Sequence, residues 1–282
     1  MKERIPAVAG TFYEGSEKKL KNQIEECFLS KIGVGKLPEV NPKGDRKIFG
    51  LICPHAGYMY SGPVASHGFY ELAKDGIPSN VIILGPNHHG TGKSISVSKQ
   101  DFWQTPLGKI EINKKLIQSI TADSNIVYED DAAHLLEHSI EVQLPFLQYL
   151  YGNKFKLVPI SMADQSLESC MELGRSIADE AQIDDILVIA STDLTHYEDA
   201  QTAKRKDSAV IKNILDLDAD KMYETILKQD ISMCGPGPVA VLISAAEVVG
   251  ANKTQLLKYA NSGDTSGDYG QVVGYATITF CK

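Results

Sequence analysis

The sequence has no apolar run long enough to cross a membrane. The longest run, residues 236–246, has about half the length of a membrane-spanning helix and is followed by Glu247. The first six residues, MKERIP, carry charges where a signal peptide would have a continuous apolar segment. We therefore expect neither a leader peptide nor a membrane anchor.

Cysteines are few, and none form a C-x-x-C pair. The five in the chain are widely scattered: Cys27, Cys53, Cys170, Cys234 and Cys281. An odd and dispersed set of this kind does not suit a disulfide framework. The sequence therefore predicts a protein of the reducing cytoplasm, in which most of these thiols are small buried apolar groups.

Positive charge is also in deficit, because 28 Lys and Arg face 36 Asp and Glu for a formal net charge of −8. Nucleic-acid-binding surfaces need clustered basic residues, so we expect no nucleic-acid partner. The hydrophobic content of 43% excludes disordered and collagen-like classes. A chain of 282 residues is long enough to bury a large core.

Two common catalytic motifs are missing. Residues 87–94 (NHHGTGKS) approach a nucleotide-binding P-loop, but Asn87 replaces the first glycine. The residues that follow, 94–98, alternate like a strand and do not open a helix. The sequence contains no G-x-S-x-G elbow either. We therefore exclude a P-loop nucleotide site and a standard serine hydrolase.

Short apolar runs alternate with amphipathic segments along the chain. The runs 48–53, 81–84, 157–160 and 186–190 are predicted to be buried strands, and 255–260 and 272–280 to be closing strands. Helices are predicted over 17–29, 64–74, 114–121, 139–151, 167–181, 202–217, 219–228 and 238–249. This alternation predicts a single α/β domain over residues 1–282, with a central mainly parallel or mixed sheet flanked by helices.

Three of the predicted strands run directly into a segment that contains a histidine. His55 follows the run 48–53, His88 follows 81–84, and His196 follows 186–190. The carboxyl ends of parallel strands meet at one edge of a sheet, where ligands bind. We therefore expect these histidines to share a site.

Two further segments have functional character. In residues 137–141 (EHSIE), Ser139 is predicted to cap a helix, with Pro145 marking a kink or a second helix start. Cys234 lies in a tight loop before the predicted helix 238–249, and a helix N-terminus favours a thiolate. Such a thiol suits either a metal ligand or a nucleophile.

Taken together, these motifs resemble those of the Memo family, whose prokaryotic members are often called AmmeMemoRadiSam system protein B. The resemblance extends over nearly the whole chain. It rests on residues 6–13 (PAVAGTFY), 54–58 (PHAGY), 85–89 (GPNHH), 137–141 (EHSIE), 191–196 (STDLTH), 234–235 (CG) and 261–264 (NSGD).

The resemblance implies a fold similar to that of the class III, LigB-type extradiol dioxygenases, which are non-haem iron enzymes that open catechol rings. It implies metal ligands at His55, His88 and Cys234, with the thiol where the dioxygenases have a carboxylate. It also implies an acid–base role for His196, a place in the site for Asp193, and a substrate contact for His138.

A thiolate in place of a carboxylate changes the chemistry expected of such a site. The softer ligand shifts metal preference toward copper or zinc, while iron stays a candidate. The sulfur is also oxidisable. His89 is adjacent to a ligand and cannot point the same way, so we expect it to support the site from outside the ligand set.

Three functions are compatible with these residues. The first is a metal-dependent oxidoreductase of unspecified substrate that binds iron or copper, or zinc, at His55, His88 and Cys234, with Asp193 orienting His196. The second is a module that binds a phosphorylated or anionic peptide or ligand in the same pocket. The third is a thiol hydrolase with Cys234 as nucleophile and His196 as base. The family label further suggests radical-SAM and AMMECR-type proteins as pathway partners.

Overall fold

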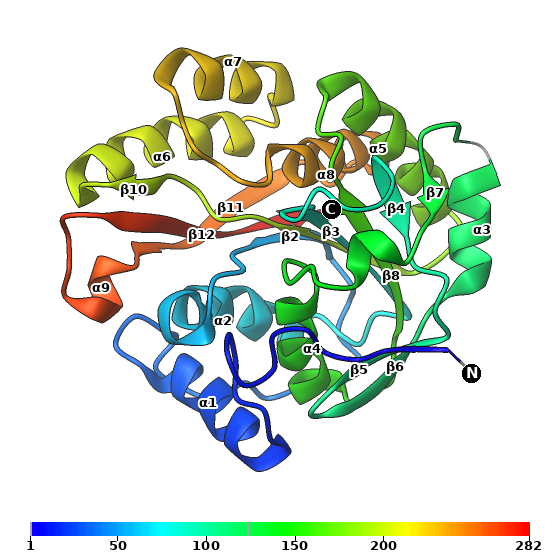
Figure 1. Cartoon of the computed structure of the whole chain (residues 1–282), viewed down its shortest axis with the longest axis horizontal. Helices are drawn as coiled ribbons and strands as arrows, with labels where there is room; N and C mark the ends of the chain where they lie inside the picture. The colour runs from blue at the N-terminus through cyan, green and yellow to red at the C-terminus, as the bar shows by residue number, and fades with distance from the viewer. Residues whose placement is uncertain (1, 123) are drawn as a thin grey trace.

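The computed structural model describes residues 2–122 and 124–282. A mixed sheet crosses the middle of the molecule and has helices on both faces (Figure 1). Helices α5, α6, α7 and α8 cover one face, and α1, α2 and α4 cover the other. The chain therefore has the α/β architecture that the sequence predicts.

The helices vary from one turn to more than four turns. The α-helices are α1 (Glu17–Leu29), α2 (Tyr58–Lys74), α3 (Lys114–Ala122), α4 (Leu144–Tyr151), α5 (Leu167–Ala181), α6 (Ala200–Leu215), α7 (Ala219–Gln229), α8 (Pro236–Val249) and α9 (Gly263–Ser266). Two 3-10 helices, η1 (Ala132–His134) and η2 (Glu141–Gln143), precede α4. None of the helices in the described ranges has the length and apolar character needed to cross a membrane.

The strands belong to two sheets. They are β1 (Glu3–Arg4), β2 (Ile48–Cys53), β3 (Asn80–Pro86), β4 (Ile95–Val97), β5 (Phe102–Thr105), β6 (Gly108–Glu111), β7 (Tyr128–Glu129), β8 (Lys156–Met162), β9 (Ile186–Ser191), β10 (His196–Glu198), β11 (Lys253–Asn261) and β12 (Val272–Cys281). The large sheet has the order β10-β12-β2-β9-β3-β8-β4-β7, with β11 also paired to β12, and the small sheet has the order β1-β5-β6.

The centre of the large sheet is parallel and its margins are mixed. Strand β9 lies between β2 and β3 and runs parallel to both, and β3 runs parallel to β8. Strands β12 and β4 join this parallel group in the antiparallel direction. Every residue of β2, β3 and β9 is buried, as expected for strands enclosed by helices on both faces. The prediction of a mainly parallel or mixed sheet is confirmed.

Most predicted elements form within two residues of their predicted bounds, but α2 differs. It begins at Tyr58, six residues before the predicted start at 64, and contains Pro63. Gly62 and Pro63 disfavour a helix locally. Both residues are buried against the rest of the protein, so tertiary packing overrides their local preference. The helix consequently starts immediately after the His55 loop.

The predicted helix 139–151 is divided. Glu141–Gln143 forms a 3-10 turn, and α4 then starts at Leu144 with Pro145 in its first turn, so Pro145 does mark a second start. The prediction that Ser139 caps the helix is wrong. Its hydroxyl instead donates to the backbone oxygen of Pro86 at 2.9 Å, which ties this segment to the end of β3.

Candidate metal centre

The predicted convergence of strand ends is present in the sheet. Strands β2, β9 and β3 are parallel neighbours, so their carboxyl ends lie at one edge. His55 follows β2 and His88 follows β3 after one further residue each, whereas His196 begins β10 after a longer turn. The sheet therefore brings the first two histidines together directly.

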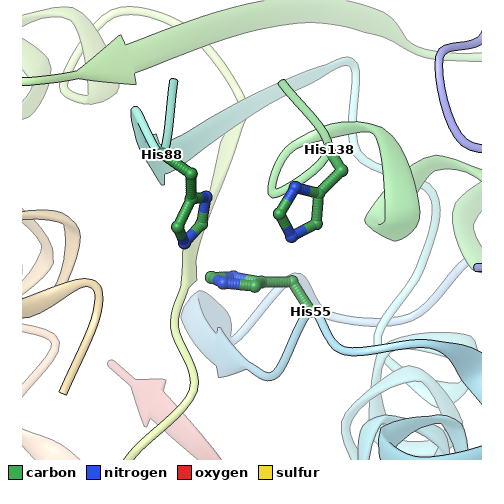
Figure 2. Close-up of side chains that lie close together, drawn as sticks. All are labelled: His55, His88 and His138. Carbon is green, nitrogen blue, oxygen red and sulfur yellow. The ribbon is translucent and has the colours of Figure 1, made fainter. Parts of the chain in front are cut away.

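Three imidazole rings form the centre of the site, and Figure 2 shows them pointing toward one another from three separate segments. The ring centroids of His55 and His88 are 5.2 Å apart, those of His55 and His138 are 5.5 Å apart, and those of His88 and His138 are 4.7 Å apart. One ligand nitrogen from each ring lies within 4.8 Å of the others. We refer to these residues as the histidine cluster.

The outer nitrogen of His55 has a defined hydrogen-bonding role. Nδ1 lies 2.9 Å from Ser191 Oγ, which donates its own proton to the backbone oxygen of Ser139 at 2.6 Å. The same hydroxyl accepts a bond from Gln143 Nε2 at 2.8 Å. Because the single hydroxyl proton is used, Ser191 accepts from His55 Nδ1. The lone pair of His55 Nε2 is thereby directed into the cluster.

Glu137 orients His88 in the same way. Its carboxylate accepts a bond from His88 Nδ1 at 3.0 Å and one from the His88 backbone N–H at 2.6 Å. The backbone N–H groups of His138 and Ser139 each donate to it at 2.8 Å. Burial opposes ionisation, but the bond from His88 and these amides hold the pKa of Glu137 below its usual range. A carboxylate behind a histidine fixes the ring so that its other nitrogen can bind a metal.

His138 completes the cluster from the segment before η2. Its ring stacks on His88 and lies 4.6 Å from the ring of Phe12. Burial lowers the pKa of His138 to about 4, and burial together with the neighbouring histidines lowers the pKa of His55 well below its usual value. Both rings are therefore neutral at pH 7, which is the form that binds metal ions.

Cys234 lies beside His55, at one side of the cluster. Its Sγ is 3.3 Å from His55 Nε2 and accepts a bond from the backbone N–H of Asp193 at 3.1 Å. Gly235 permits this approach, because a Cβ there would lie 2.7 Å from the backbone oxygen of Ser191. Burial and the Asp193 carboxylate raise the pKa of the Cys234 thiol, so the predicted thiolate stabilisation by the helix is outweighed.

Asp193 and His196 occupy the site edge but do not pair as predicted. Asp193 Oδ1 accepts the backbone N–H of His55 at 2.8 Å, and burial raises the pKa of this carboxyl to about 6. His196 Nδ1 donates to the Ser232 oxygen at 2.8 Å, so Ser232 and not Asp193 orients the ring. The thiol of Cys234 is paired with His55, which removes the Cys234–His196 arrangement that a thiol hydrolase would need.

The remaining histidines lie outside the cluster. His89 is exposed and faces Glu137 and His138 within ligand distance, His67 bonds the Ile32 oxygen from α2, and His134 is buried in η1. The position of His89 outside the histidine cluster agrees with its adjacency to His88 in the sequence. The sequence reasoning missed Glu137 and Ser191, which fix the rings of His88 and His55. Both lie in segments already identified, one beside His138 and the other at the end of β9.

Comparisons with known proteins agree with these motifs. A family model described as Memo-like protein matches residues 4–279. The chain is 48% identical to a MEMO1 family protein of Methanopyrus kandleri, with 99% of each chain covered, and 46% identical to one of Thermotoga maritima, with 96% of this chain and 97% of the relative covered. An uncharacterized protein of Escherichia coli K12 has a similar fold, with a TM-score of 0.58, 13% identity, and coverage of 83% of this chain and 100% of that chain. The chain therefore belongs to the Memo-like family.

Proposed function

We propose that the protein binds one metal ion at His55, His88 and Cys234 and acts as a metal-dependent oxidoreductase. The carrying observation is the fixed orientation of two imidazoles. Ser191 holds Nδ1 of His55 and Glu137 holds Nδ1 of His88, while the inner nitrogens converge. Neutral, converging imidazoles with outer hydrogen bonds are the usual arrangement of histidine metal ligands.

The third ligand distinguishes two versions of this site. His138 already lies within ligand distance of both other histidines, whereas Cys234 Sγ lies next to His55. We assign the third position to Cys234, because a thiolate is a much stronger ligand for soft ions than a third imidazole. The thiol must lose its proton for this role, and its raised pKa makes metal binding the step that releases that proton.

Iron or copper suits this donor set, and zinc is a further candidate. A redox-active ion bound here would supply electron transfer to the substrate. The chain's own residues supply the proton transfer. His196 Nδ1 donates to the backbone oxygen of Ser232, which leaves Nε2 available to take or deliver a proton. His138 contributes a neutral ring at the substrate side, packed on Phe12.

An anion-binding module is less well supported. Phosphate recognition relies on Arg and Lys side chains that form charge-assisted bonds. Within residues 2–122 and 124–282, the charged groups hydrogen-bonded to the histidine cluster are the carboxylates of Glu137 and Asp193, and both would repel an anion.

The five cysteines are unpaired, which supports a cytoplasmic location. Radical-SAM and AMMECR-type partners stay predictions of the family resemblance.

Metal analysis of protein purified without oxygen tests the proposal. We expect about one equivalent of iron or copper per chain, and loss of at least tenfold in affinity in Cys234→Ser and His55→Gln. Cys281→Ser is the matched control, because that half-buried thiol lies at the far end of β12. Reconstitution with cobalt(II) should give a thiolate charge-transfer band that Cys234→Ser abolishes and His138→Gln keeps. The proposal fails if no metal binds, and the assignment of Cys234 fails if only His138→Gln removes the ion.

A further inference from the structure

A cavity outside the histidine cluster lies beside the segments that carry His55 and His196. Its volume is about 390 Å³, and its walls include Tyr60 of α2, Tyr197 of β10, Tyr275 of β12 and Asp268 of the turn after α9. In Figure 1 these elements meet around the start of α2, next to α9 and the β10–β12 pair. We call this cavity the tyrosine pocket.

Two residues in the wall of the tyrosine pocket directly follow site residues in the sequence. Ala56 in its wall follows His55, and Tyr197 follows His196, whose ring lies 5.8 Å from the tyrosine ring. Tyr197 has a backbone φ of 58° and interrupts the pairing of β10 with β12. A non-glycine residue held in this conformation carries strain. The irregularity lets two consecutive side chains face different surroundings, because His196 bonds the Ser232 backbone oxygen and Tyr197 lines the tyrosine pocket.

Tyr275 is unusual among the buried tyrosines. The hydroxyls of Tyr13, Tyr58 and Tyr151 donate to Glu141, to the Val142 oxygen and to the Leu72 oxygen. Tyr275 is only 2% exposed, yet its hydroxyl has no hydrogen-bond partner in the described parts of the chain. Tyr275 lines the tyrosine pocket and its hydroxyl is not fully enclosed by protein, so the hydroxyl is accessible from the pocket. A buried phenol without a partner is a group available to a ligand.

The charge of the pocket selects the ligand. Asp268 is its one charged wall residue among those described, and the buried Asp193 acts on Tyr275 from the adjoining site. Aromatic faces attract cations through their quadrupole, and a carboxylate adds to this attraction. The net charge of −8 favours cations in general.

We propose that the tyrosine pocket binds a protonated amine, with the ammonium group among the three tyrosine rings and hydrogen-bonded to Tyr275 and Asp268. Ala56 and Tyr197 in the wall of the pocket directly follow His55 and His196, so a bound amine would lie next to the segments that carry the proposed site. Binding of the amine does not require the metal ion.

Three probes of nearly equal shape isolate the charge: 3,3-dimethylbutan-1-amine, 3,3-dimethylbutan-1-ol and 3,3-dimethylbutanoate. Binding is measured by calorimetry and by ligand-observed NMR on the full chain with a chelator present, so that the result is independent of the metal proposal. We expect the amine to bind at least about tenfold more tightly than the alcohol, and the carboxylate to bind most weakly.

Variants locate the binding. Asp268→Asn should weaken the amine about three- to tenfold and leave the alcohol unchanged, and Tyr275→Phe should weaken the amine by a similar factor. Tyr149→Phe is the control, because that hydroxyl bonds Glu25 on α1, outside the pocket. The proposal is overturned if the alcohol or the carboxylate binds as tightly as the amine, if no amine binding saturates by about 10 mM, or if neither pocket variant changes the amine affinity.

Discussion

Two glutamates four residues apart, Glu137 and Glu141, are both buried, yet they belong to different kinds of polar cluster. Glu141 faces the N-terminal segment, and Glu137 faces the histidine cluster. The same short segment before α4 therefore contributes to the stability of the fold on one side and to the candidate site on the other.

The cluster around Glu141 is closed. Its two oxygens accept Arg4 Nη1 at 2.7 Å, the Tyr13 hydroxyl at 2.6 Å, and the backbone N–H groups of Ala7 and Val8 at 2.8 and 3.1 Å. Arg4 Nε and Nη2 donate to the backbone oxygens of His134 and Glu137. Each side-chain nitrogen of Arg4 and each oxygen of Glu141 therefore has a partner inside the cluster. This cluster attaches residues 4–13 to the body of the protein.

The cluster around Glu137 is open. The carboxylate is satisfied, but the bond it accepts from His88 Nδ1 leaves the inner nitrogen of that ring without a fixed partner. Ser191 likewise directs the inner nitrogen of His55 into the cluster, where the Cys234 thiol lies 3.3 Å away. A buried network in which ring nitrogens point their lone pairs toward a common centre suits a metal ion. A network whose groups are all bonded to one another contributes to stability instead.

The largest effect on stability is expected from Glu141→Gln, which tests the structural role of the closed cluster. Glu141→Gln leaves one carbonyl oxygen for four donors and leaves the buried Arg4 without its counter-charge. Breaking a buried ion pair from one side costs about 3–5 kcal/mol. We expect the free energy of unfolding, measured by urea titration, to fall by about that amount.

Metal content provides the control for this prediction. Glu141→Gln protein that is still folded should keep its metal stoichiometry, because this glutamate bonds Arg4, Tyr13 and the backbone of residues 7 and 8 instead of a proposed ligand. The comparison breaks down if Glu141→Gln is as stable as the wild type, or if it loses metal while it stays folded.

Whether a contact in these clusters can be predicted from the sequence depends on what sets it. Contacts set by regular strands are predictable, and contacts set by loop conformations are not. The apolar runs and strand-end histidines predict the α/β fold and the meeting of His55 with His88, because parallel strands share an edge. The partners of Cys234 and His196 depend instead on loop conformations. The thiol-hydrolase hypothesis pairs them with each other, whereas the loops place Cys234 on His55 and His196 on Ser232.

The closed cluster has no periodic signal in the sequence. Arg4 and Glu141 are separated by 137 residues, and Arg4 looks like an ordinary charge near the start of the chain. The small sheet of β1, β5 and β6 is equally hidden, because its strands are short and only partly buried. Contacts of this kind are fixed by packing and not by local preference.

An intermediate effect on stability is expected from His134, a buried histidine whose backbone oxygen is bonded by Arg4 of the closed cluster. It packs on Trp103 and Arg4 bonds its backbone oxygen, but neither ring nitrogen has a partner in the described chain. Burial lowers the pKa of His134 to about 4, and the Arg4 charge adds to this, while Asp131 and Asp130 oppose it.

The lowered pKa fixes the direction of the pH dependence. Between about pH 6.5 and pH 4 the unfolded chain binds a proton that the folded chain does not, so stability falls as pH falls through this window. The loss amounts to about 3 kcal/mol. His134→Phe should reduce the fall in unfolding free energy between pH 7 and pH 4 by about this amount. The exposed His89→Gln is the control, and equal slopes for wild type and His134→Phe would contradict the prediction.

The smallest effect is expected on the open side, from Glu137→Gln. The amide that replaces the carboxylate has one oxygen for four donors of His88, His138 and Ser139 and no charge to hold the ring, so metal affinity should fall about 10- to 100-fold. This corresponds to about 1.4–2.7 kcal/mol. Competition with a chromophoric chelator measures the affinity, and urea titration on the metal-free protein measures stability. The open and closed clusters are distinct if Glu137→Gln lowers affinity more than stability and Glu141→Gln does the reverse. Equal losses in both measurements for both variants would mean that the segment acts as one structural unit, with no separate role for Glu137 behind the metal ligand.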